Sequence, residues 1–163
     1  MVLIAWAAVL AAELRAPGRH AAAGTLLAAI TGAMAVSVLS GGVEVGVAHT
    51  AMRSASPGFL RGAYLLASSL YPTPYLFVAL AAAAVVLGGR AVLPTWFAWL
   101  SGIVGVLNFL GGISVKSSGF FATNDGGAIV IAGLALAVWV LAASWILWRR
   151  PPLQEPRLPA PVG

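Results

Sequence analysis

Long apolar stretches separated by charged residues run through most of this sequence. Four stretches contain no Asp, Glu, Lys or Arg: residues 20–43, 62–89, 91–115 and 126–148, of 24, 28, 25 and 23 residues. An α-helix rises about 1.5 Å per residue, so roughly 20 apolar residues cross the hydrocarbon core of a bilayer. Because a helix satisfies its own backbone polar groups, we predict four full membrane-spanning helices, near residues 20–49, 60–88, 93–115 and 126–148.

The N-terminal residues form a shorter apolar stretch, from Met1 to Ala12, which Glu13 and Arg15 follow. Twelve residues give about 18 Å of helix, which is too short to cross a bilayer alone. A signal peptide is not indicated, because no basic residue precedes the stretch and charged residues stand where small cleavage-site residues are expected. We expect a partial helix over residues 1–13, the remainder of a spanning helix that starts upstream, with a tilted or half-inserted helix as the alternative.

The composition agrees with a membrane protein. Of the 163 residues, 61% are hydrophobic and 8% are charged, whereas soluble domains have about 45–50% apolar and about 25% charged residues. A soluble domain of this size has too much surface to hide so many apolar side chains. We therefore predict an all-α polytopic transmembrane helix bundle, one domain over residues 1–150, followed by a disordered Pro-rich tail over residues 151–163 that holds five prolines.

Charge and motifs exclude several classes of function. The net charge of +5 comes from nine Lys and Arg residues that are scattered along the chain, mostly at the ends of apolar stretches, whereas a nucleic-acid-binding face needs a cluster of them. There is no Cys, which excludes disulfides and thiolate metal sites, and the HExxH, GxSxG, Walker and GxGxxG motifs are absent. We expect the lipid bilayer as surroundings, no nucleic-acid partner, no metal, no cofactor and no catalytic residue.

The arginines and tryptophans indicate the orientation in the membrane. If the segments alternate in direction, one side receives six cations and the other receives three; the six are Arg15, Arg19, Arg90, Arg149, Arg150 and Arg157, and the three are Arg53, Arg61 and Lys116. The side richer in cations is usually cytoplasmic, so the C-terminal tail should be cytoplasmic in the inner membrane of a bacterium. Interface anchors are expected on the same side: Trp96, Trp99, Trp145, Trp148, Arg149 and Arg150.

Small residues at helical spacing predict the faces on which the helices pack. Membrane helices associate through small residues and polar contacts, because apolar side chains gain little by leaving lipid. Three stripes are present: Gly24, Ala28, Thr31, Ala35, Gly42 and Gly46; Ser101, Gly105, Asn108 and Gly112; and Gly126, Gly133, Ala137 and Ser144. We expect each stripe to face another helix, within one chain or in a homo-oligomer.

Two prolines interrupt the segment over residues 62–89, at Pro72 and Pro74. Each proline lacks a backbone donor and clashes with the carbonyl four residues earlier, so a helix break near the bilayer midplane is expected. Ser68, Ser69 and Thr73 are candidates to bond the freed backbone groups. Broken helices often form substrate sites in transporters, although a proline kink can also serve packing alone.

Three polar residues are candidates for an intramembrane site: Glu44, His49 and Asn108. A carboxylate inside a membrane is costly, so Glu44 should point to other helices or to water, as a proton or cation site or as a residue near the interface. Ser37 and Ser40 share its helix face. His49 stands five residues further on, which does not support a metal site with Glu44, and Asn108 suits an interhelical hydrogen bond.

Two late segments carry strings that are typical of one group of proteins. The strings are Leu93-Pro94-Thr95-Trp96-Phe97-Ala98-Trp99-Leu100, followed by Gly102 and Gly105, and Val138-Trp139-Val140-Leu141-Ala142-Ala143-Ser144, followed by Leu147-Trp148-Arg149-Arg150. Over residues 57–150 the chain resembles bacterial multi-helix membrane proteins of the domain-of-unknown-function kind. The resemblance implies about six helices and brings no activity with it.

Two main hypotheses for the function follow, and a third, an intramembrane enzyme, is disfavoured by the missing catalytic motifs. The first is a non-enzymatic structural or interaction component of the bacterial inner membrane. The second is a small transporter or channel for a proton, a cation or a small solute, which uses Glu44 and the Pro72/Pro74 break. A water-accessible cavity that reaches Glu44 favours the second hypothesis, and tight packing around Glu44 favours the first.

Overall fold

The computed structural model describes residues 2–15, 20–51, 56–114, 119–122 and 126–149, and within them it contains six helices. These are α1 (Val2–Glu13), α2 (His20–Ala51), α3 (Pro57–Leu70), α4 (Thr73–Gly89), α5 (Thr95–Gly112) and α6 (Gly127–Trp148). Four stretches are long and apolar enough to cross a membrane: His20–His49, Pro57–Gly89, Thr95–Gly112 and Gly127–Trp148. The predicted all-α class, with four spanning helices and a short N-terminal helix, is confirmed. The predicted tail lies outside the described residues.

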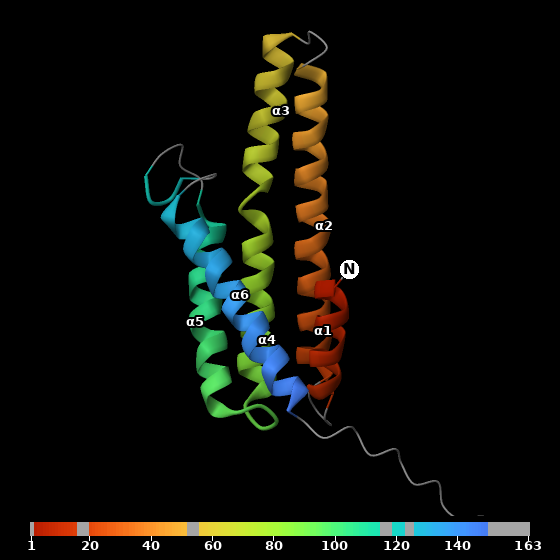
Figure 1. Cartoon of the computed structure of the whole chain (residues 1–163), viewed down its shortest axis with the longest axis vertical. Helices are drawn as coiled ribbons and strands as arrows, with labels where there is room; N and C mark the ends of the chain where they lie inside the picture. Colours follow the sequence, from red (N-terminus) through yellow and green to blue (C-terminus); the bar gives the residue numbers. More distant parts are fainter. Residues whose placement is uncertain (1, 16–19, 52–55, 115–118, 123–125, 150–163) are drawn as a thin grey trace, which may run out of the picture.

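The helices form a bundle in which α4 is central (Figure 1). It packs on α2 on one side and on α5 on the other, α5 packs on α6, and α1 lies against α2 and touches α6. Glycine permits the closest approaches. A Cβ atom on Gly111 of α5 would lie 2.7 Å from Ala132 Cβ of α6, and one on Gly88 of α4 would clash with Ala22 of α2. The helices therefore meet nearly backbone to backbone.

An aromatic cluster joins α1, α5 and α6. Trp139 is fully buried, and its Nε1 donates a 2.8 Å hydrogen bond to Ser101 Oγ. Ser101 Oγ in turn donates to the carbonyl of Phe97 at 2.8 Å. The Trp139 ring stacks on Phe97 with the ring centroids 6.4 Å apart, and the edge-to-face contact with Trp6 has a centroid distance of 5.3 Å. This cluster links the short α1 to α6, in addition to the packing of α1 on α2.

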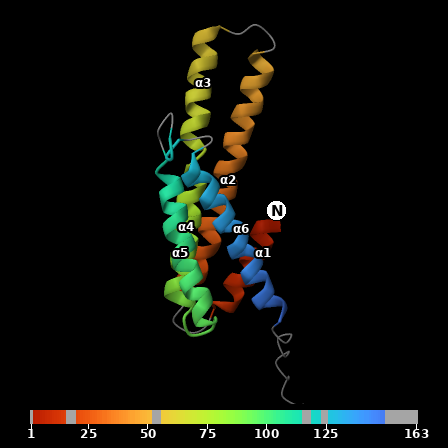
Figure 2. The ribbon, with the colours of Figure 1, turned by 60° about the vertical axis from the view of Figure 1, so that its left-hand side comes forward.

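The helices differ greatly in length. The 32 residues of α2 correspond to about 48 Å at 1.5 Å per residue, whereas the 18 residues of α5 correspond to about 27 Å. As a result, α3 and the adjoining end of α2 extend beyond α5 and α6 (Figures 1 and 2). We call α3 and residues 45–51 of α2 the projecting hairpin. Many apolar side chains on it are exposed: Val45, Phe59, Tyr64, Leu65 and Leu66.

The helix breaks at the prolines, and the break lies toward one end of the bundle, whereas its depth in a bilayer stays a prediction. Helix α3 ends at Leu70 and α4 begins at Thr73. The break is level with the end of α5, because a Cβ on Gly112 would clash with Leu76, and Gly111 lies beside Tyr75. The Pro57–Gly89 stretch has 33 residues, more than a bilayer requires, so the middle of its sequence is not its midpoint in the bundle. Ser68 and Ser69 both donate to the Leu65 carbonyl, at 3.0 and 2.7 Å, and not to the groups that the prolines free.

The three small-residue stripes differ in whether they pack against another helix. On α5 the prediction is right: Ser101, Asn108 and Gly112 are buried against neighbouring helices. On α6, Ala137 and Ser144 are exposed and face no other helix among the described residues, because α6 instead buries the face that carries Trp139.

The α2 stripe faces no other helix in the described part of the chain. Its six residues are all exposed or nearly so, and a Cβ on Gly24, Gly42 or Gly46 would meet no atom within 4 Å. The hydrophobic contacts of α2 are instead made by the opposite face, through residues such as Leu26 and Ile30. The stripe is therefore an outer surface of the bundle.

Candidate functional site

A groove of about 350 Å³ lies between α2, α4 and α6. We call it the α2–α6 groove. Its lining comes from α1 (Leu3), α2 (Ile30, Ala33, Met34, Ser37, Ser40, Gly41, Glu44), the break and α4 (Tyr71, Pro74, Tyr75, Val78) and α6 (Leu136). Small-molecule pockets usually have about 300–1,000 Å³, so the groove has room for one small or slender molecule.

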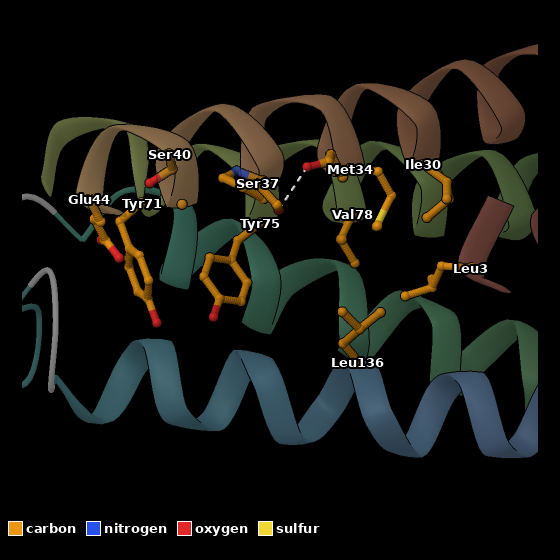
Figure 3. Close-up of a pocket in the computed structure, with 13 residues that line it drawn as sticks. Leu3, Ile30, Met34, Ser37, Ser40, Glu44, Tyr71, Tyr75, Val78 and Leu136 are labelled. Atoms are coloured by element: carbon orange, nitrogen blue, oxygen red, sulfur yellow. Dashed lines mark hydrogen bonds between the residues drawn. The ribbon is translucent and has the colours of Figure 1, made fainter. Parts of the chain in front are cut away.

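One end of the groove is polar. Glu44, Tyr71 and Tyr75 lie together at this end, and their oxygen atoms point from α2 and α4 in the direction of α6 (Figure 3). The side chain of Glu44 is exposed, and Tyr71 is 37% exposed. In the described part of the chain, no hydrogen bond or ion pair reaches the Glu44 carboxylate. This end therefore offers a bound molecule one carboxylate and two tyrosine side chains, each with a hydroxyl group and an aromatic ring.

The serines at the polar end are already engaged with the backbone. Ser37 Oγ donates to the Ala33 carbonyl of its own helix at 2.8 Å, the bond drawn in Figure 3. Ser40 Oγ donates across to the Ala67 carbonyl of α3 at 3.5 Å. The Ala67 carbonyl also accepts from Tyr71 N at 3.1 Å. Ser40 thus joins α2 to α3 beside the break.

The other end of the groove is apolar. Ile30, Met34 and Val78 form its sides, Leu136 reaches it from α6, and Leu3 closes it at the start of α1 (Figure 3). Glu44 and Ile30 are fourteen residues apart on α2, which is about 21 Å along the helix. Half of a bilayer's hydrocarbon core is about 15 Å. The groove is therefore as long as one lipid tail together with part of a head group.

Local sequence explains why the groove is there. Gly41 has no side chain at the position where α2 faces the groove, and a Cβ added to it would meet no atom within 4 Å. Tyr71 and Tyr75 are four residues apart on either side of Pro72 and Pro74, so the broken helix places both rings on one face. The short α1 reaches the groove only with Leu3. The space beyond Leu3, up to Glu44, is therefore left open.

Two of the site residues predicted from the sequence meet in the groove. Glu44 and Pro74 both line it, so the structure brings together the acidic residue and the proline break. Pro72 precedes α4 as its N-cap residue. The serines on the helix face of Glu44 do not hydrogen-bond its carboxylate, because Ser37 and Ser40 bond backbone carbonyls. The amide of Asn108 is engaged between α5 and α6.

His49 and Asn108 lie elsewhere. His49 is exposed near the end of α2 and does not line the groove. Asn108 is fully buried and makes the predicted interhelical contact, since its Nδ2 donates to Ala132 O of α6 at 3.4 Å and to Val104 O at 2.9 Å. Its Oδ1 is buried without a partner among the described residues. Across those residues, no group of three or more His, Cys, Asp or Glu side chains could hold a metal ion.

The interface anchors gather at the opposite end of the bundle from the projecting hairpin. Helix α5 begins, and α4 and α6 end, at this end (Figure 1). Trp96, Trp99 and Trp148 are at least half exposed here. Arg149 Cζ lies 4.1 Å from the centre of the Trp145 ring, a cation–π contact. Arg150 lies outside the described residues.

Sequence reasoning missed Tyr71, Tyr75 and Gly41 as site residues. The tyrosines stand on either side of the two prolines, and their spacing of four residues was the signal that both would point the same way. Gly41 had no such signal, because glycine is common in this sequence, at 19 of 163 residues.

No family model, curated protein or solved structure matches this chain. The resemblance of residues 57–150 to membrane proteins of the domain-of-unknown-function kind therefore stays a prediction.

Proposed function

We propose that this protein is a small transporter-like membrane protein that binds a slender, partly apolar solute in the α2–α6 groove. The observation that carries the proposal is a groove of about 350 Å³ that reaches Glu44 and the helix break together. An intramembrane carboxylate that faces a cavity is typical of a functional residue, and discontinuous helices often line transport sites. The chemistry required is binding, for which the described residues provide a polar end and an apolar end.

A second candidate function is that of an interaction component, and the outer stripe of α2 favours it. Gly24 and Gly42 face away from the other described helices, with open space at each Cβ. Small residues on a lipid-facing surface let a second helix approach closely. The partner under this candidate is a second copy of this chain or another membrane protein.

Two neighbouring glycines of α2 separate the two candidates. Gly41 lines the groove, whereas Gly42 is on the outer stripe, and a Cβ at either position meets open space. A leucine is therefore tolerated at both. Gly41→Leu should fill the groove and abolish one-to-one retention of dodecanol, a neutral single-chain probe. Gly42→Leu should leave that retention unchanged and lower self-association. Native mass spectrometry of protein released from a neutral detergent measures both quantities.

Each result is decisive for one candidate. If Gly41→Leu retains dodecanol as well as the wild type does, the groove is not the binding site. If the wild type retains no dodecanol, the proposed binding function is wrong. If the wild type is monomeric, or if Gly42→Leu forms as much oligomer as the wild type, the outer stripe is not an interface.

We also propose that the end of the bundle rich in arginine faces the cytoplasm of a bacterium. Arg90 follows α4 and Arg149 follows α6, at the same end as the tryptophan anchors, and such an excess of positive charge is typical of the cytoplasmic side. A reporter fused after Arg157 should be located in the cytoplasm, and a reporter inserted at Gly119 should be located outside the cell membrane. The opposite pattern would reverse the orientation.

A further inference from the structure

The lining of the α2–α6 groove is divided into two chemically different ends. The residues around Ile30, Met34 and Leu136 offer only aliphatic and thioether surface, and the end at Glu44 offers all of the groove's acidic and phenolic groups. A molecule that fits both ends has an apolar tail and a polar head. We infer that the solute is a single-chain amphiphile with a cationic ammonium head, an inference that rests on the proposed function.

The sign of the head group follows from the charges that line the groove. Among the described residues that line the groove, Glu44 is the one charged side chain, and none is Lys, Arg or His. Of the described cations, Arg15, Arg90 and Arg149 are at the far end of the bundle. Arg61 precedes Tyr71 by ten residues, about 15 Å of helix, and His49 follows Glu44 by five. The local field at the polar end therefore favours a cation.

Tyr71 and Tyr75 add a second preference for the same head group. Their rings lie next to Glu44 at the polar end (Figure 3). Aromatic faces attract ammonium groups, and aromatic side chains commonly form the sites that hold quaternary ammonium ligands. A fully substituted ammonium has no hydrogen-bond donor, so it loses nothing where the serine hydroxyls are already bonded to the backbone.

The number of tails and the route of entry follow from the shape of the groove. Its volume of about 350 Å³ and its length suit one chain and not two. Met34 and Leu136 are partly exposed, and Ser37 and Glu44 are exposed, so the groove is open along its side. An amphiphile already inserted in the bilayer, with its head at the interface, can enter without leaving the lipid. We therefore assign the membrane as the source of the ligand.

Three probes of matched chemistry test the inference on the full-length protein in a neutral detergent. Dodecyltrimethylammonium has the cationic head and the tail, dodecyl sulfate has the tail with an anionic head, and butyltrimethylammonium has the head with a short tail. We expect one-to-one binding of dodecyltrimethylammonium at least tenfold tighter than that of either other probe. Equal or tighter binding of dodecyl sulfate would overturn the cationic head, and equal binding of butyltrimethylammonium would overturn the tail.

Glu44→Gln provides the second arm. It keeps the size of the side chain and removes its charge, so the tenfold preference for dodecyltrimethylammonium over dodecyl sulfate should disappear, while dodecanol is still retained. The matched control is Glu13→Gln, which removes the other described acidic side chain, at the end of α1 and outside the groove. Its preference should equal that of the wild type. If Glu44→Gln keeps the preference for dodecyltrimethylammonium over dodecyl sulfate, the assignment of the head group is wrong. Gly41→Leu tests the binding site independently through dodecanol, so the proposed function and the ligand class can fail separately.

Discussion

Trp139→Ala is expected to lower the free energy of unfolding by about 3–5 kcal/mol, the usual effect of removing a large core aromatic side chain. Trp139 is fully buried, and α1 and α5 both pack on its ring through Trp6 and Phe97. The substitution leaves a cavity where three helices meet, and Ser101 Oγ loses its indole donor. Unfolding by denaturant in mixed micelles, followed by circular dichroism, measures the loss.

Two controls show what Trp139 contributes. Trp139→Phe keeps one aromatic ring but removes the pyrrole part of the indole and the hydrogen bond to Ser101. It should cost more than about 0.6 kcal/mol, the mean for side-chain hydrogen bonds between membrane helices, and less than Trp139→Ala. Trp148 is 79% exposed at the end of α6, and Trp148→Ala should change stability by at most about 0.5 kcal/mol. Equal losses for Trp139→Ala and Trp148→Ala would contradict a packed aromatic cluster.

Gly111→Ala is expected to cost about 1–3 kcal/mol, as overpacking does in other cores. The new Cβ would lie 2.7 Å from Ala132 Cβ, a short rigid side chain that cannot rotate away. Helices α5 and α6 would have to separate, which would also lengthen the bond from Asn108 to Ala132 O. The same unfolding experiment measures the effect.

Gly102→Ala is the matched control on the same helix. A Cβ there would lie 4.0 Å from Val86 Cγ2, an ordinary contact. Alanine is a better helix former than glycine by up to about 1 kcal/mol, so this variant should be as stable as the wild type or more stable. If both variants had the same stability, the close approach of α5 and α6 at Gly111 would be refuted.

The helices could be predicted from the sequence because charge and apolar length determine them. The predicted span 126–148 and the helix Gly127–Trp148 nearly coincide, and the predicted 20–49 is close to His20–Ala51. The faces that pack were harder to predict, because small residues cover several faces of α2 and α6 in a sequence so rich in Ala and Gly. The buried face of α6 is the one that carries Trp139, a large residue that contacts α1 and α5.

The candidate site could be predicted only in part, for a similar reason. Glu44 and the prolines were recognisable because their residue types are costly inside a membrane helix. Their meeting in one groove depends on how α2 and α4 are aligned lengthwise, and the sequence carries no marker of that alignment. Residues that define the groove by being small, such as Gly41, or by filling its far end, such as Leu3, are ordinary in any membrane helix.

The projecting hairpin gives this molecule two hydrophobic thicknesses. On the side of α5 and α6 the apolar length suits a bilayer of ordinary thickness, whereas α2 and the joined α3 and α4 are longer than the usual hydrocarbon core of about 30 Å. A bilayer around such a protein meets hydrophobic mismatch on one side only, which costs a fraction of a kcal/mol per Å and is relieved by tilt or by local thickening. We therefore expect the mismatch to act on α2 and α3, the helices that extend furthest (Figure 1), and not on α5 and α6.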